Sequence, residues 1–130
     1  MSDFSTALAI AASGMRTQAA RLTHVSENIA NTDTPGYRRK LTSFEPDRSA
    51  GAVAGTVTTG RLQLDQTALP QVYDPSHPLA DASGHYAGSN VDMVVEIADA
   101  RQAQRSYEAN LRVFDQVRQM SSSLNDLLRR

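Results

Sequence analysis

The 130-residue sequence has no cysteine and no tryptophan, and only 5% of its residues are aromatic. Without cysteine there is no disulfide framework, no thiolate chemistry and no cysteine-based zinc site. Few aromatic side chains disfavour a compact core built on large anchors, although the length is enough for one small domain. The lack of cysteine fits the cytosol, and it fits equally a protein that crosses into an oxidising space.

Strong net charge and long apolar runs are also missing. The formal net charge is −1, which gives no electrostatic reason to expect a nucleic acid or an anionic membrane surface as partner. No apolar run approaches the roughly 20 residues of a membrane span, and the N-terminal segment lacks the features of a cleavable signal peptide. We therefore expect no nucleic-acid partner and no membrane insertion.

Apolar residues recur in steps of three and four at both ends of the chain, the pattern of long amphipathic helices. Small residues flank the N-terminal series. This predicts a narrow apolar contact surface, or seam, against a closely packed helix. Ser5 and Asn90 are the expected N-caps of the two helices. The predicted assembly seam consists of Leu8, Met15, Leu22, Val25 and Ile29 on the first helix and Ile97, Tyr107, Leu111, Phe114, Val117 and Leu124 on the second.

The run NTDTPGY marks the end of the first helix. Asn31 tolerates the left-handed conformation that often ends a helix, and Pro35 biases Thr34 towards extended geometry. Pro35 and Gly36 then predict a turn. We expect the ring of Tyr37 to pack on the C-terminal helix, with its hydroxyl hydrogen-bonded or hydrated.

The segment between the helices has a different composition. Glycine and proline recur along it, and its apolar residues show no helical period. Alternating runs predict short strands at 41–44, 56–58, 62–64 and 71–73. The three adjacent basic residues 38–40 predict a solvated face. Residues 49–59 are small and polar, which predicts a segment that is mobile until something binds it.

These patterns predict a mainly α fold with a small β-leaning insert. Residues 1–36 and 90–130 are expected to form an antiparallel coiled-coil pair of terminal helices, and residues 37–89 the insert. Two helices alone bury little apolar area, so both should fray in the free chain. We therefore expect a polymerising subunit that assembles helically with copies of itself or with related chains.

The strongest candidate for a chemical site consists of Asp74, His77, Asp81 and His85. Carboxylates and imidazoles at short spacing could hold a metal, but they lie in a proline-rich loop without a helical register to fix their geometry. We expect instead a rigid turn in which Asp74 bonds the following backbone. No arrangement of His, Ser and acid suggests a nucleophile with its base, so the sequence predicts no catalytic residue, metal or cofactor.

Three asparagines in the helical regions allow two interpretations. Asn28, Asn31 and Asn110 either cap helices and face solvent, or bond neighbouring helices and fix their register, as a polar residue in a seam can. For Asn28 both interpretations stay open. For Asn31 the cap is favoured.

Several motifs resemble those of the bacterial flagellar axial proteins, the rod and hook families. The N-terminal signature is AASGM at 11–15 and ENIANTDTPGYRR at 27–39, while YDPSHPLAD at 73–81 and RSYEAN at 105–110 are similar to a proximal rod subunit in particular. Ser89 departs from the family's pattern, which has proline there, and residues 49–69 carry none of the resemblance. The motif residues are Asn28, Asn31, Thr34, Pro35, Gly36, Tyr37, Asp74, Pro75, His77, Pro78, Arg105, Tyr107 and Asn110.

The resemblance implies a structural, non-catalytic subunit of the proximal rod, the drive shaft of the flagellar basal body in the periplasm. It also implies export by the flagellar type III apparatus without a cleaved signal peptide, and terminal helices that are poorly ordered before assembly. The implied partners are copies of the chain, other rod subunits and the export apparatus, with no small-molecule substrate. The alternatives are another proximal rod subunit of the family or, from a different class, a cytoplasmic helical adaptor or export chaperone.

Overall fold

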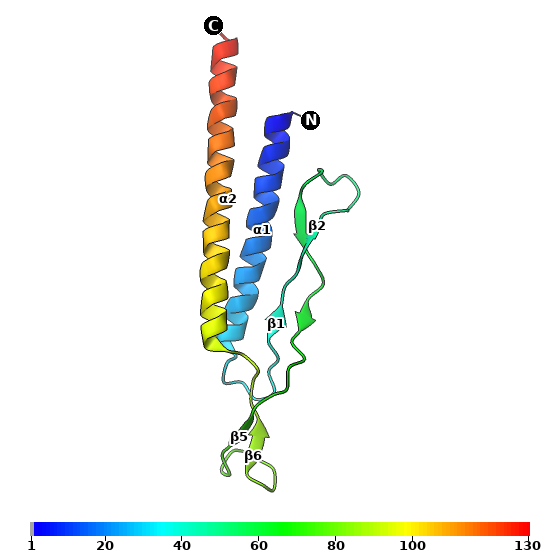
Figure 1. Ribbon diagram of the computed structural model, residues 1–130, viewed down its shortest axis with the longest axis vertical. Helices are drawn as coiled ribbons and strands as arrows, with labels where there is room; N and C mark the ends of the chain where they lie inside the picture. Colours follow the sequence, from blue (N-terminus) through cyan, green and yellow to red (C-terminus); the bar gives the residue numbers. More distant parts are fainter. Residues whose placement is uncertain (1) are drawn as a thin grey trace.

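The computed structural model describes residues 2–130 as two long antiparallel helices with a β insert beside them (Figure 1). Helix α1 spans Asp3–Ala30 and helix α2 spans Met93–Leu128. The predicted fold, mainly α with a small β insert, is confirmed. Helix α2 has 36 residues against 28 in α1, so at 1.5 Å per residue it is about 12 Å longer. Its C-terminal turns extend beyond the N-terminus of α1 (Figure 1).

Both helices begin on caps other than those predicted. The hydroxyl of Ser2 caps α1 by accepting a hydrogen bond from the backbone N–H of Ser5 at 3.2 Å. The carboxylate of Asp92 caps α2 by accepting from the N–H of Val94 at 3.0 Å. Serine and aspartate are as good at this position as the residues we expected, so cap chemistry alone does not choose between close neighbours in the sequence.

The face that α2 turns towards α1 is not its predicted apolar series. Glu96 and Ala103 are fully buried there, and Ser106 and Asn110 are half-buried. Of the predicted α2 seam, Phe114 and Val117 are half-buried, but the exposed fractions of Ile97, Tyr107, Leu111 and Leu124 lie between 36% and 44%. The prediction that the two apolar series pack on each other is therefore wrong for α2. Their role as an assembly seam stays a prediction.

Small side chains explain why this face of α2 packs on α1. A Cβ atom added to Gly14 of α1 would lie 2.9 Å from the side-chain amide of Asn110, and Ala103 has no exposed surface. The distance between packed helices depends on the side chains at the contact, so glycine and alanine let the two backbones approach closely. On α1 the predicted seam is better covered: Val25 is buried, and Leu8, Met15, Leu22 and Ile29 are half-buried.

The insert consists, within the described chain, of three two-stranded antiparallel ribbons. The strands are β1 (Lys40–Leu41), β2 (Phe44–Pro46), β3 (Val57–Thr59), β4 (Gln63–Leu64), β5 (Gln71–Tyr73) and β6 (His85–Ala87). The pairs β1–β4 and β2–β3 follow one another in a long hairpin that runs beside α1 (Figure 1). The pair β5–β6 forms a second hairpin that projects past the end of the helices where α2 begins (Figure 1).

The predicted strand at 41–44 is split because the long hairpin is interrupted there. The N–H of Gly60 donates to the carbonyl of Ser43 at 2.9 Å, and a Cβ atom at Gly60 would collide with the Ser43 hydroxyl. Further along, the N–H of Val57 donates to the buried hydroxyl of Ser13 on α1 at 3.1 Å. Strand β3, which begins in the segment predicted to be mobile until bound, is thereby packed on α1.

Candidate functional site

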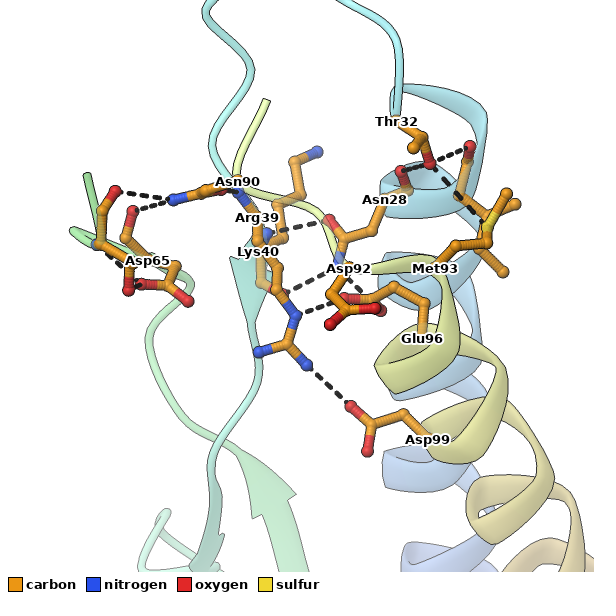
Figure 2. Close-up of polar contacts among 12 residues, drawn as sticks. Asn28, Thr32, Arg39, Lys40, Asp65, Asn90, Asp92, Met93, Glu96 and Asp99 are labelled. Atoms are coloured by element: carbon orange, nitrogen blue, oxygen red, sulfur yellow. Dashed lines mark hydrogen bonds and ion pairs between the residues drawn. The ribbon is translucent and has the colours of Figure 1, made fainter. Parts of the chain in front are cut away.

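A network of polar side chains joins the end of α1, the first strand of the insert and the start of α2 (Figure 2). We call this network the polar junction. It is formed by Asn28, Arg39, Lys40, Asn90, Glu96 and Asp99.

Asn28 lies at the centre of the polar junction and only 1% of its surface is exposed. Its side-chain oxygen accepts from the N–H of Lys40 at 2.9 Å and from the hydroxyl of Tyr37 at 3.0 Å. Its amide nitrogen donates to the carbonyl of Lys40 at 3.1 Å and to the Glu96 carboxylate at 3.3 Å. Asn28 thus bonds the neighbouring helix, the second of the two interpretations that the sequence left open.

Arg39 holds the two acidic residues of the first turns of α2. Its Nε donates to the carboxylate of Glu96, and its Nη2 donates to that of Asp99 at 2.9 Å. Arg21 of α1 donates to the other oxygen of Asp99 at 3.1 Å. The Glu96 side chain has no exposed surface, and a buried carboxylate is tolerated only when it is paired. Arg39 and Asn28 supply this pairing.

The groups around Arg39 keep its side chain positively charged. Burial alone would lower the pKa of Arg39, but the hydrogen bond and the charge of Glu96, together with Asp99 and Asp65, raise it instead. The guanidinium therefore stays protonated. It pairs with the two carboxylates of α2 whenever these are ionised.

The other two basic residues of this run are also engaged, so the prediction of a solvated face for 38–40 is wrong. Arg38 donates from Nη1 to the carbonyls of Asp65 and Thr67, both at 3.1 Å. The Nζ of Lys40 lies 2.5 Å from the carboxylate of Glu27 on α1. This hydrogen bond lowers the pKa of Glu27, to which His24 makes a smaller contribution, and it raises the pKa of Lys40. Successive side chains of an extended segment point in different directions, so each finds a different acceptor.

Helix α1 ends at Ala30 with Asn31 as its C-cap, as predicted. The backbone N–H of Asn31 donates to Glu27 O at 3.1 Å, and its side-chain amide donates to the same oxygen at 2.8 Å. Asn31 itself has a φ of −107°, so the left-handed residue is Gly36, with a φ of 74°. The N–H of Gly36 donates to the carbonyl of Ala87 at 3.1 Å. The turn is therefore tied to β6.

The hydroxyl of Tyr37 is hydrogen-bonded, as expected, and its partner is Asn28 of α1; packing of the ring on α2 stays a prediction. Burial raises the pKa of the Tyr37 phenol. The Tyr37 carbonyl accepts from the N–H of Asn90 at 3.3 Å. The side chain of Asn90 accepts from the N–H of Arg39 at 2.6 Å and donates to the carbonyl of Asp65 at 2.9 Å. Asn90 therefore connects the segment before α2 to both arms of the long hairpin rather than capping the helix.

Ser89, at the position where the resemblance implies proline, makes a contact that proline could not make. It is buried, and its hydroxyl donates to the carbonyl of Thr32. The bond lies between the turn after α1 and the segment before α2, so it adds to the connection between the two helices at this end of the molecule.

The motif at 73–81 forms the loop between β5 and β6. The Asp74 carboxylate accepts from the N–H of Ser76 at 3.2 Å and from its hydroxyl at 2.7 Å, so the predicted turn is confirmed. The ring of His77 stacks on Tyr86 with a centroid distance of 3.9 Å. Pro75 and Pro78 are exposed in this loop. In residues 2–130, no three His, Asp or Glu side chains come together in a group that could hold a metal.

The motif at 105–110 is divided between two sides of α2. The side chain of Asn110 packs against Gly14, and its amide donates to the carbonyl of Ser106 at 2.9 Å. Arg105 and Tyr107 lie on exposed positions of the same helix. One side of this motif therefore fixes the helix pair and the other is uncovered.

Sequence reasoning missed Glu96, Arg39 and Gly14 as residues that fix the arrangement. A signal for the contact face was present, because Glu96, Ala103, Asn110 and Val117 follow one another at intervals of seven. Such a heptad series favours a helical neighbour. The signal is weak because, apart from Val117, the members of the series are small or polar, and a stronger apolar series runs beside it.

Comparisons with known proteins agree with this architecture. The family described as "Flagella basal body rod protein" matches residues 1–38, and the family described as "Flagellar basal body rod FlgEFG protein C-terminal" matches residues 82–127. The flagellar basal-body rod protein FlgC of Agrobacterium fabrum is 41% identical over 99% of this chain and 98% of its own length. The chain belongs to the FlgC family of flagellar basal-body rod proteins.

Two further FlgC proteins match at lower identity. That of Salmonella typhimurium is 36% identical over 85% of this chain and 87% of its own length, and that of Aquifex aeolicus is 34% identical over 88% and 89%. The two family matches cover α1 and most of α2 and leave out the long hairpin. No helix of this FlgC-family chain within residues 2–130 has the length and apolar character needed to cross a membrane.

Proposed function

We propose that this FlgC-family chain is a structural, non-enzymatic subunit of the proximal rod in the periplasm. It leaves the cytoplasm through the flagellar export apparatus without a cleaved signal peptide. It then assembles helically with copies of itself and with other rod subunits, through the apolar side chains that its helices leave uncovered.

The observation that carries this proposal is the set of exposed apolar side chains along α2. They are Met93, Ile97 and Leu111 and, nearer the end of the helix, Met120, Leu124 and Leu127, with exposed fractions between 40% and 64%. At 3.6 residues per turn, the first three lie on one flank of the face that packs on α1 and the last three on the other flank. Burial of such surface contributes about 25 cal/mol per Å², and exposed apolar surface marks interaction sites. Because α1 packs on the small and polar face of α2, these side chains remain free for neighbours.

The two ends of the helix pair differ in a way that supports assembly. At one end the polar junction connects α1, α2 and the insert. Towards the other end the helices separate (Figure 1), and a groove of about 480 Å³ opens between Leu8 of α1 and the α2 segment around Ser121. The last turns of α2 extend past α1 and carry Leu124 and Leu127, both exposed. This end needs further helices to cover it.

The relatives support the same assignment. The FlgC proteins of Agrobacterium fabrum and Salmonella typhimurium are named as basal-body rod proteins. The family matches lie on the two terminal segments, which are the segments that would make the assembly contacts.

Circular dichroism of the purified chain, compared with the chain assembled in isolated basal bodies or reconstituted filaments, tests the proposal. A rod subunit should show incomplete helix as a free chain and gain helix on assembly, because two helices alone are marginal. A cytoplasmic adaptor or chaperone should instead unfold cooperatively from a fully helical state as purified, and should be absent from isolated basal bodies. Either of these two results would contradict the proposal.

A further inference from the structure

The β5–β6 hairpin contains two histidines in adjacent turns, His77 in its loop and His85 at the start of β6, and the proposed function uses neither of them. The loop lies at the end of the molecule opposite the free ends of the helices (Figure 1). His77 opens the turn 77–80, in which the N–H of Ala80 donates to the carbonyl of His77 at 3.0 Å. His85 closes the turn 81–85, in which the N–H of Asp81 donates to the carbonyl of His85 at 2.8 Å.

The imidazole of His77 acts as a hydrogen-bond acceptor. The backbone N–H of Leu79 donates to its Nδ1 at 3.1 Å. A ring nitrogen that accepts carries no proton, so the ring in this turn is neutral with its proton on Nε2. In the imidazolium form both nitrogens are donors. Protonation therefore removes the bond and turns an N–H of the ring towards the N–H of Leu79.

The ring of His77 is held in place from its other side. It stacks on Tyr86 of β6 with a centroid distance of 3.9 Å and an interplanar angle of 14°. An aromatic face also attracts a cation, so the imidazolium keeps this stacking. The conflict between the two N–H groups therefore breaks this hydrogen bond, either through a flip of the ring within the stack or through movement of the backbone around Leu79.

The second histidine responds differently. The Nδ1 of His85 lies 3.0 Å from the hydroxyl of Ser83, and that hydroxyl donates to the Asp81 carboxylate at 2.6 Å. Since its proton is already used, the Ser83 oxygen accepts from an N–H at Nδ1 of His85. This bond exists in the imidazolium and in one neutral tautomer. Protonation of His85 therefore leaves the turn 81–85 intact.

The charged and titratable groups on the segments packed around His77 belong to this hairpin. They are Asp74 and Asp81 in the loop, Tyr73 on β5, and His85 and Tyr86 on β6. Asp81 keeps its negative charge because the Ser83 hydroxyl and the His85 N–H lower its pKa.

We propose that His77 is a pH-sensitive latch of the turn 77–80. When the ring is neutral, its Nδ1 holds the Leu79 amide inside the turn. When the ring takes up a proton, the Leu79 amide is released, while the backbone bond between Ala80 and His77 and the adjacent turn 81–85 remain. Leu79 is 64% exposed at the tip, so the latch changes the shape of this end of the molecule.

Amide hydrogen exchange of the full-length ¹⁵N-labelled chain between pH 8 and pH 5 tests the latch, because imidazoles titrate in this range. Exchange is expressed relative to an unstructured peptide at the same pH. Protection of the Leu79 amide should fall roughly 2- to 10-fold, the worth of one ordinary hydrogen bond. The fall should follow the ring signals of His77, whereas the amides of Asp74 and His85 should keep their protection.

Two variants provide matched controls. In His77→Asn the side-chain oxygen can accept from the Leu79 amide as in an Asx turn but does not titrate, so protection should stay constant with pH. In His85→Asn the fall at Leu79 should persist. The latch is excluded by constant Leu79 protection in the unmodified chain or by the same fall in His77→Asn. Simultaneous loss at Asp74 would also exclude it, because the whole hairpin would then be opening.

Discussion

Asn28 connects α1, β1 and α2 through a single side chain. Its oxygen and its amide nitrogen both face protein groups, and the residue is almost completely buried. Buried polar groups without partners cost free energy, whereas satisfied ones specify one arrangement. At the scale of the residue, Asn28 is therefore the group on which the register of the helices and the insert depends.

Replacing Asn28 by alanine should lower the free energy of unfolding by about 3 kcal/mol, because Lys40, Tyr37 and Glu96 each lose a hydrogen-bond partner. Denaturant unfolding of the purified chain, followed by tyrosine near-ultraviolet circular dichroism, measures this change. Asn125→Ala, at an exposed position near the end of α2, is the matched control and should stay within about 0.5 kcal/mol. Equal effects of the two substitutions would mean that the junction does not fix the fold.

The buried phenol of Tyr37 lets us predict how the free energy of unfolding depends on pH in alkaline solution. Burial raises its pKa above the ordinary value of 10.0, so the folded chain holds the phenol proton more tightly than the unfolded chain. The resulting contribution to the free energy of unfolding is present in full below pH 10. It is lost as the pH rises through the pKa that Tyr37 has in the folded chain. Lys40, whose pKa its bond to Glu27 raises above 10.5, acts in the same direction.

Unfolding midpoints between pH 8 and pH 11 measure this dependence. They should be level up to about pH 10 and then fall, and Tyr37→Phe should make the fall shallower. At pH 8 the same variant should be slightly less stable, because the Asn28 oxygen loses one donor. An identical alkaline fall in both chains would show that the Tyr37 phenol is not the group responsible.

At the scale of the element, the turn after α1 separates the helices from the insert. Asn31 and Thr32 cap the helix end with side-chain bonds to the last carbonyls. Gly36 takes a positive φ and donates to Ala87. The helix is thus stopped by its caps, and Pro35 with Gly36 sets the direction in which the chain leaves.

Replacing Pro35 and Gly36 by two alanines should raise the helicity of the free chain modestly while rod assembly fails. The change removes a helix breaker and places a Cβ at a φ of 74°, where it is disfavoured. Far-ultraviolet circular dichroism and incorporation into basal bodies are the two measurements. Normal incorporation would show that the direction set by this turn is not needed.

Elements with a strong local signal were predictable from the sequence. The periodic patterns give both helices, and the run NTDTPGY gives the end of α1. Strand β6 and the caps at Ser2 and Asp92 were missed, because short strands and neighbouring cap residues carry weak local signals. The polar junction was not predictable, since Arg39 and Glu96 are far apart in the chain and each looks like an ordinary surface charge. They come together only because the segment 39–40 is bonded to both helices in the folded chain.

At the scale of the whole molecule, one end is fixed by polar contacts and the opposite end of the helix pair is open. The tip of the long hairpin around Gly51 lies away from the polar junction and is exposed. Its glycines Gly51 and Gly55 have positive φ angles, and Gly55 lies against Ile10 of α1. The tip should therefore tolerate added length on the Gly51 side.

A four-residue Gly/Ser insertion after Gly51 should leave export, assembly and swimming intact, because the closure cost of a loop grows slowly with its length. Motility in soft agar and recovery of the chain in basal bodies are the measurements. Loss of motility with normal export would mean that the tip makes a specific contact in the rod.

The central claim is that the uncovered apolar side chains of α2 form the assembly surface, and Leu111→Asp tests it most directly. Leu111 is 40% exposed in the single chain, so the folded chain tolerates the substitution, but a carboxylate buried without a partner in an assembled bundle costs several kcal/mol. Arg112→Asp is the control, because this exposed position is turned about 100° from Leu111 and faces away from both sets of exposed apolar side chains. The account predicts that both variants are exported and that Leu111→Asp alone is missing from basal bodies. Normal incorporation and swimming of the Leu111→Asp strain would contradict it.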